Sequence, residues 1–150
     1  MTTFVLTWDG SQTGYFRDNY GNDIAATAAG RTVAGRWSCG SRRSGAAPGD
    51  RVFLLRQKSD RGIVASGRLA DGLVFPAPHW AGDPLKVTHY VEVLWDRVVP
   101  VACRLPFADL LHAVPGHNWQ HIFASGQRVR PPADVALEEA WAGHLEDLGG

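Results

Sequence analysis

Two consecutive β-strand patterns near the middle of the chain constrain its fold most strongly. Apolar residues dominate Val52–Gln57 and Gly62–Leu69, and the polar stretch Lys58–Arg61 separates them. Apolar runs of this length, bounded by polar and turn-forming residues, are typical of a β-hairpin. A turn signal at Pro48–Asp50 precedes the first run. We therefore expect a β-rich domain built around this hairpin.

Shorter patterns on both sides of the hairpin predict the other elements. Strands are expected at Phe4–Trp8, Gly35–Ser38 (a strand or a turn), His89–Trp95 and Ile122–Gln127, and helices at Asp23–Ala29 and Pro106–Ala113. Residues 71–84 are rich in Gly, Pro and Ala and predict a long loop. The chain closes with a helix that begins near Pro132 and carries an apolar stripe of Leu137, Trp141, Leu145 and Leu148. About five or six strands with short helices favour an α+β fold whose sheet forms a small closed or half-closed barrel.

Size and composition limit the class of protein. A length of 150 residues favours one domain spanning residues 1–150, which can bury a core without disulfides. The two cysteines, Cys39 and Cys103, have neither metal-binding nor redox spacing, so we expect a reducing cytoplasm and neither metal nor cofactor. No apolar stretch is long enough to cross a membrane, and no signal peptide is evident. We expect the chain to be the N-terminal part of a longer protein.

The charges are unevenly distributed along the chain. The formal net charge of zero argues against non-specific binding to nucleic acid. Between Arg31 and Arg68, however, nine basic residues stand against two acidic ones, a net charge of +7. Residues 134–150 carry five acidic side chains and neither Lys nor Arg. This asymmetry favours one face for an anionic partner, and the alternative is a set of arginines that only decorates exposed strands.

Eight short motifs span nearly the whole chain in a fixed order. They are Phe4–Trp8, Gly35–Ser38, Pro48–Gln57, Arg61–Gly67, His79–Trp80, Val91–Asp96, Val114–Gly116 and Ala124–Gly126. In this order they resemble the EVE domain, a PUA-like domain related to YTH and ASCH domains. The chain is most similar to EVE domains at the N-terminus of bacterial HNH endonucleases that restrict modified DNA. It departs from them at Asp9–Gly10, where the family usually has Asn-Pro, and in residues 75–87.

The resemblance implies a DNA-binding module that recognises a modified base, above all 5-methylcytosine or 5-hydroxymethylcytosine. A base in a duplex must leave the stack for full inspection, which costs about a few kcal/mol. Such a module would be the specificity domain of a type IV restriction system in the bacterial cytoplasm. Its partners would be modified double-stranded DNA and a fused HNH nuclease domain. We expect no catalytic residue here, because the chain has no HNH motif.

The same resemblance implies an aromatic pocket for the flipped base. Trp37 and Ser38 match a pair that YTH relatives use as one cage wall and a hydrogen-bonding position. Stacking of a base on an aromatic ring contributes about 1–3 kcal/mol. Further pocket candidates are Trp80 as a second wall and, around it, Trp8, Asp9, Asn19 and Tyr20. The alternatives are core positions for Trp37 and Trp8, a loop anchor at the end of the barrel for Trp80, and turns for Ser38, Asp9 and Asn19. Trp95, Trp119 and Trp141 are assigned to structure.

Cations and polar residues near the hairpin predict contacts with the DNA backbone. The candidates for binding phosphate are Arg42, Arg43, Arg56, Lys58 and Arg61. Gln57 is a candidate for entering a groove or filling the gap that the flipped base leaves. Ser125 and Gln127 are candidates for the pocket floor or a phosphate contact, and the alternative is a turn that closes the barrel.

Three other functions stay open at this point. An RNA-binding PUA-like domain that reads a modified RNA base would prefer RNA over DNA through the 2′-hydroxyl. An enzyme acting on modified nucleosides would need a nucleophile and a base in contact, and no spacing predicts such an arrangement. In a purely structural domain, loss of Trp37 would unfold the protein rather than abolish binding alone.

Overall fold

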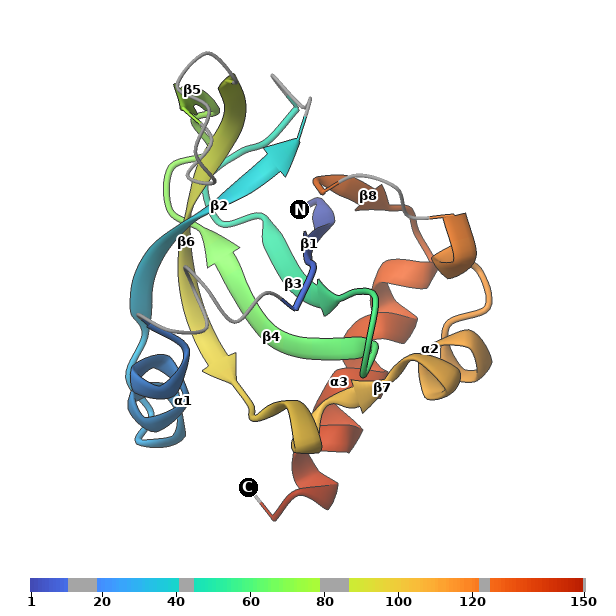
Figure 1. The fold of residues 1–150 in the computed structure, drawn as a ribbon. Coiled ribbons are helices and arrows are strands. Elements are labelled where there is room, and N and C mark those ends of the chain that lie inside the picture. The colour runs from blue at the N-terminus through green and yellow to red at the C-terminus, as the bar shows by residue number, and fades with distance from the viewer. Residues whose placement is uncertain (11–18, 41–44, 79–86, 122–124, 150) are drawn as a thin grey trace.

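The computed structural model is an α+β fold and describes residues 1–10, 19–40, 45–78, 87–121 and 125–149 (Figure 1). Its strands are β1 (Thr3–Trp8), β2 (Val33–Gly40), β3 (Arg51–Arg56), β4 (Gly62–Leu69), β5 (Phe75–Pro78), β6 (Val87–Val98), β7 (Leu105–Pro106) and β8 (Gln127–Val129). Its helices are α1 (Gly21–Ala28), α2 (Phe107–Ala113) and α3 (Ala133–Asp147). Single 3-10 turns lie at Val101–Cys103 and Trp119–His121.

The predicted hairpin is confirmed and lies in the middle of the sheet. Strands β3 and β4 pair antiparallel from Arg51 opposite Arg68 to Arg56 opposite Gly62. The main path of the sheet runs β2-β6-β4-β3-β1-β8, with β5 added to β6 and β7 added to β4. Strands β1 and β3 are parallel, so the C-terminal ends of both strands lie at the same edge of the sheet.

The prediction of a closed barrel is wrong. Eight strands, rather than about five or six, form one open sheet in the part of the chain that the structure describes. Its terminal strands are β2 and β8, and no strand pairing joins them among these residues. The sheet is strongly curved, so that β2 comes back toward β1 (Figure 1). Side chains rather than a strand ladder bridge these two strands, as described below.

Several segments differ from the sequence expectation. Within the predicted loop 71–84, Phe75–Pro78 forms β5, whose two prolines are tolerated because the strand pairs only with β6. Within the predicted strand at 122–127, residues 122–124 lie outside the described residues, residues 125–126 form a turn, and β8 begins at Gln127. Strands β2 and β6 also extend beyond their predicted bounds.

The sheet separates two hydrophobic clusters. On its concave side, Phe4 and Leu6 of β1 join a cluster with Trp95 of β6. On the opposite side, Val5 of β1 joins a cluster with residues of α2 and α3, including Trp141. Successive side chains of a strand point to opposite faces, so β1 and β3 supply both clusters. This double burial explains why the central residues of both strands, Phe4–Leu6 and Val52–Leu55, are continuously apolar instead of alternating.

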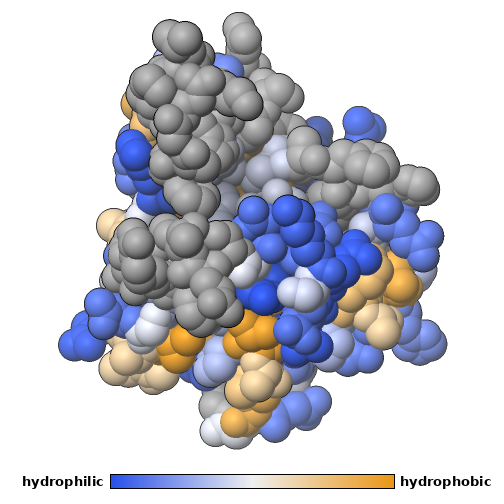
Figure 2. Space-filling view, in the orientation of Figure 1, coloured by the Kyte–Doolittle hydropathy of each residue, from blue (hydrophilic) through white to orange (hydrophobic). Residues whose placement is uncertain are grey.

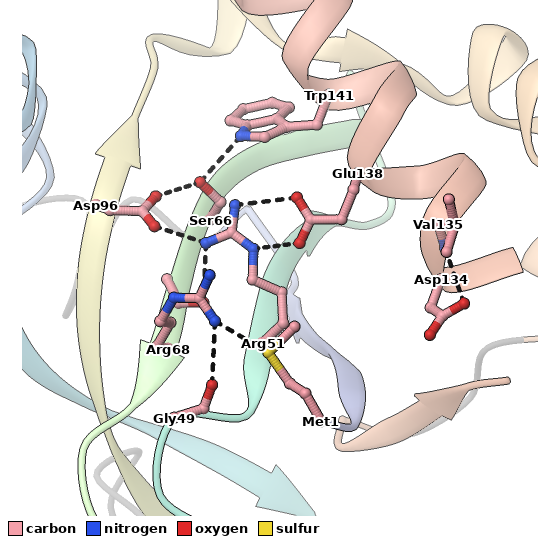
Figure 3. Close-up of polar contacts among 11 residues, drawn as sticks. Met1, Gly49, Arg51, Ser66, Arg68, Asp96, Asp134, Val135, Glu138 and Trp141 are labelled. Atoms are coloured by element: carbon pink, nitrogen blue, oxygen red, sulfur yellow. Dashed lines mark hydrogen bonds and ion pairs between the residues drawn. The ribbon is translucent and has the colours of Figure 1, made fainter. Parts of the chain in front are cut away.

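A buried arginine connects α3 to the sheet (Figure 3). The Arg51 guanidinium donates to the carboxylates of Asp96 and Glu138, each at 2.6 Å. Ser66 donates to Asp96 at 2.5 Å and accepts a hydrogen bond from Trp141 Nε1 at 2.9 Å. Burial lowers the pKa of Arg51, but the contacts with the two carboxylates outweigh burial and leave this pKa above its ordinary value. The network fixes α3 over β3, β4 and β6.

Candidate nucleic-acid interface

Trp37 is a half-buried aromatic side chain on β2. Its Nε1 donates to the Thr7 carbonyl oxygen at 2.9 Å, which joins β2 to β1. Its ring also meets Trp95 edge to face, with centroids 6.1 Å apart and an angle of 87° between the planes. These two contacts fix the orientation of an indole that remains partly accessible. An oriented, accessible aromatic ring is suited to stacking on a planar base.

Ser125 bridges the same two strands. Its hydroxyl accepts a hydrogen bond from the Thr7 amide at 3.0 Å and donates to the Ser38 carbonyl at 2.5 Å. Beside it, Gly126 has φ +89°, and a Cβ there would lie 2.7 Å from the Cys39 carbonyl oxygen. We call the hydrogen bonds from Trp37 to Thr7 and from Ser125 to Thr7 and Ser38 the β1–β2 seam. The Ser125 hydroxyl is thus engaged within the protein and has a structural role.

Replacing Ser125 with alanine should destabilise the protein. The substitution leaves the Thr7 amide and the Ser38 carbonyl without this partner in a partly buried place, which costs about 1–3 kcal/mol. Urea unfolding would measure the change, with Ser125→Thr as a control that retains the hydroxyl. Equal stability of Ser125→Ala and the wild type would show that the Ser125 hydrogen bonds contribute nothing to the stability of the fold.

The Ser38 hydroxyl does not share a face with the Trp37 ring. The two residues are consecutive in β2 and pair in register with Val91 and Tyr90 of β6, before the irregularity that follows Ser38. Side chains therefore leave the strand on opposite sides at these two positions. The Ser38 hydroxyl, predicted as a hydrogen-bonding group, therefore does not lie beside the Trp37 ring, which is the predicted stacking surface of this pair.

Trp8 and Tyr20 lie in the core, which corrects their assignment to the pocket. They are each 5% exposed, and their ring centroids are 5.2 Å apart. The Tyr20 hydroxyl donates a short hydrogen bond to the Val99 carbonyl. The Arg56 guanidinium lies 4.9 Å from the centroid of the Trp8 ring. Burial by these neighbours leaves neither aromatic ring available as a wall for a base.

Burial of the Tyr20 hydroxyl leads us to expect that the protein loses stability at high pH. Burial raises the pKa of Tyr20 to about 12 from 10.0, against an opposing effect of Arg56. The unfolded chain ionises first, so this stabilisation is complete below about pH 10 and is lost as the pH rises toward 12. A pKa raised by this much corresponds to roughly a few kcal/mol of stability. Urea unfolding between about pH 8 and 11 should show a free energy of unfolding that falls as the pH rises, and this fall should be shallower in Tyr20→Phe. Equal pH dependence of the free energy in the two proteins would contradict this account.

Two of the predicted phosphate contacts are engaged within the protein. Arg56 is 9% exposed and donates from Nε to the Ser59 carbonyl at 2.9 Å, which corrects its assignment to DNA. Arg61 is half-buried, lies 3.7 Å from the Phe107 ring centroid and donates to Gln57 Oε1 at 3.2 Å. Stacking and hydrogen bonding therefore compete with any phosphate for both guanidinium groups.

The other candidates occupy different parts of the structure. Lys58 and Asp9 are exposed, and Lys58 Nζ lies 4.0 Å from Asp9 Oδ2. Asn19 is exposed just before α1, and Gln127 is half-buried at the start of β8. Trp80, Arg42 and Arg43 lie outside the described residues.

The C-terminal end of β1 brings several candidates together. Because β1 and β3 are parallel, Trp8 pairs with Arg56, and the Gln57 amide donates to the Trp8 carbonyl at 2.7 Å. Lys58 follows in the hairpin turn, close to Asp9. Trp37 donates a hydrogen bond to Thr7, the residue before Trp8 on β1. Sequence reasoning missed Thr7, because its role lies in main-chain groups that no side-chain motif reveals.

The face of the molecule that Figure 2 shows is mainly hydrophilic around its centre. Figure 2 shows hydrophilic side chains there and separate hydrophobic groups near its lower and right margins. The described residues contain no group of three or more His, Cys, Asp or Glu side chains placed to hold a metal ion. None of the described helices has the length and apolarity needed to span a membrane.

Comparisons with protein-family models, curated proteins and solved structures find no match for this chain. The resemblance to EVE domains therefore stays a prediction from the order of motifs in the sequence. What the structure adds independently is an α+β fold with an oriented tryptophan beside the C-terminal end of β1.

Proposed function

We propose that this protein is a DNA-binding module that recognises a C5-modified cytosine flipped out of the duplex. The observation that carries the proposal is the Trp37 ring, half-buried and oriented by Thr7 and Trp95. A ring that is already fixed loses little conformational entropy when a base stacks on it. Stacking of about 1–3 kcal/mol offsets part of the cost of extracting the base.

Selection of the modified base would come from its additional group. A methyl at C5 adds apolar surface that can be buried beside an aromatic ring, worth about 0.8 kcal/mol per carbon. A hydroxymethyl differs from a methyl by one hydroxyl, and an apolar pocket discriminates only weakly between two groups that differ in this way. The expected ligands are therefore 5-methylcytosine and 5-hydroxymethylcytosine, both preferred over cytosine.

The module has no catalytic role in this proposal. It acts as the specificity domain of a type IV restriction system and directs a fused HNH nuclease to modified DNA in the bacterial cytoplasm. This part of the proposal is supported only by the resemblance of the motifs to EVE domains of such endonucleases. The positively charged stretch from Arg31 to Arg68 is consistent with an anionic partner, although Arg51 and Arg56 are engaged internally. Arg31, which follows α1 on the side of the molecule opposite β8, is not part of the proposed DNA-binding surface.

Fluorescence anisotropy at a stated salt concentration tests the proposal. One duplex sequence would carry cytosine, 5-methylcytosine or 5-hydroxymethylcytosine at a single position. We expect tighter binding to both modified duplexes than to the unmodified one. Equal affinities for the three duplexes would contradict the proposal. A parallel RNA series with the same sequence tests the alternative, because a preference for modified RNA would favour a PUA-like RNA reader.

A further inference from the structure

Arg128 on β8 and Arg130, which directly follows this strand, lie at an edge of the sheet. Arg128 and Arg130 are exposed, whereas Val129 between them is 1% exposed and belongs to the hydrophobic cluster under α2 and α3. Within β8 this alternation places Arg128 on the face opposite the cluster under α2 and α3, and both arginine side chains reach solvent. The Arg130 carbonyl also accepts the Ala133 amide at 2.9 Å, which ties the end of this segment to the start of α3. We call Arg128 and Arg130 the β8 arginine pair.

The β8 arginine pair differs from the arginines that the protein uses internally. Arg51 forms ion pairs with two carboxylates, and Arg56 lies over Trp8. Within the part of the chain that the structure describes, the ion pairs involve neither Arg128 nor Arg130. Their charges are thus exposed to solvent and available to an anion.

The β8 arginine pair and Trp37 both lie beside strand β1. Arg128 lies opposite Phe4 of β1, and the seam contact of Trp37 is made at Thr7 of the same strand. At the other end of β1, Lys58 lies 4.0 Å from Asp9. From Phe4 to Asp9 an extended chain covers about 17 Å. Cations therefore flank the Trp37 contact on both sides along β1.

We propose that the β8 arginine pair binds phosphates of the nucleic-acid backbone that crosses β1. The inference rests on the proposed function and adds a surface that holds the strand while its base is inspected. Phosphate contacts of this kind position a protein without reading sequence. The competing explanation is that charged side chains protect an exposed sheet edge from pairing with another chain.

The test compares the salt dependence of binding to unmodified and 5-methylcytosine duplexes. The variants are wild type, the double variant Arg128→Gln/Arg130→Gln, and Arg31→Gln as a control that removes one positive charge elsewhere. Arg31 is an exposed arginine that follows α1, and α1 and β8 lie on opposite sides of the molecule (Figure 1). Loss of two phosphate contacts should reduce the slope of log affinity against log salt by about two. The reduction should be equal for both duplexes, because the pair reads no base.

The outcomes separate this inference from the proposed function. A smaller slope in the double variant alone supports the inference, even if the wild type shows no preference for 5-methylcytosine. An unchanged slope, or a slope that Arg31→Gln reduces equally for each charge removed, overturns the inference, even if that preference is present. Absence of binding to either duplex overturns both. Circular dichroism of the double variant shows whether the fold is retained.

Discussion

Trp141→Ala should destabilise the protein by about 3–5 kcal/mol. Trp141 is 2% exposed and meets Phe53 of β3 edge to face, with ring centroids 6.3 Å apart. Truncation would leave a cavity between α3 and the sheet and would remove the hydrogen bond from Nε1 to Ser66. Urea unfolding would measure this loss, with Trp141→Phe expected to cost less because it retains a ring.

Leu148→Ala is the control for the same helix. The apolar stripe predicted from the sequence includes both residues, but Leu148 lies beyond the end of α3 and is 39% exposed. Its replacement should change the free energy of unfolding by no more than about 0.5 kcal/mol. Similar losses for Trp141→Ala and Leu148→Ala would contradict the docking of α3 described above.

Trp37→Ala should abolish the preference for modified DNA while the protein remains folded. Loss of about 1–3 kcal/mol of stacking corresponds to an affinity for the modified duplex lower by about 5- to 150-fold. Binding to the unmodified duplex should change little, because phosphate contacts provide it. Anisotropy measures the affinities, and circular dichroism measures the fold.

Trp119→Phe is the matched control for loss of a tryptophan. Trp119 is 1% exposed and donates to the Val114 carbonyl at 3.0 Å, within the cluster that contains α2. Its replacement should lower stability and leave the ratio of affinities for modified and unmodified DNA unchanged. Unfolding of Trp37→Ala would instead assign Trp37 a purely structural role. Retained preference in a folded Trp37→Ala variant would remove Trp37 from the proposed site.

The sequence predicts those elements whose signal is local. The hairpin of β3 and β4 and the last helix are confirmed because an apolar run or an apolar stripe identifies each of them. The assignment of Trp95, Trp119 and Trp141 to the core is likewise confirmed, since each is at most 2% exposed. The openness of the sheet was not predictable, because it depends on whether distant strands β2 and β8 pair.

The candidate site was predictable only in part. Trp37 is half-buried and partly accessible, as a stacking residue must be. Tyr20 is buried where its hydroxyl reaches the Val99 carbonyl after β6, and Trp8 is buried beside Tyr20 in the concave-side cluster. No local pattern in the sequence reveals these contacts. Arg56 is buried because its pairing with Trp8 brings the guanidinium over the indole. Such contacts between distant segments decide which aromatic and basic residues remain available to a ligand.

The most direct test of the central claim is ¹⁹F NMR of protein labelled with 5-fluorotryptophan. Trp37→Phe identifies the Trp37 resonance among those of the six tryptophans. Titration with a 5-methylcytosine duplex should shift the Trp37 resonance, and the unmodified duplex at equal saturation should not. The buried Trp95 is expected to respond less than Trp37, because it meets that ring only at its edge. An unchanged Trp37 resonance in a saturated complex with modified DNA would contradict stacking of the base on this residue.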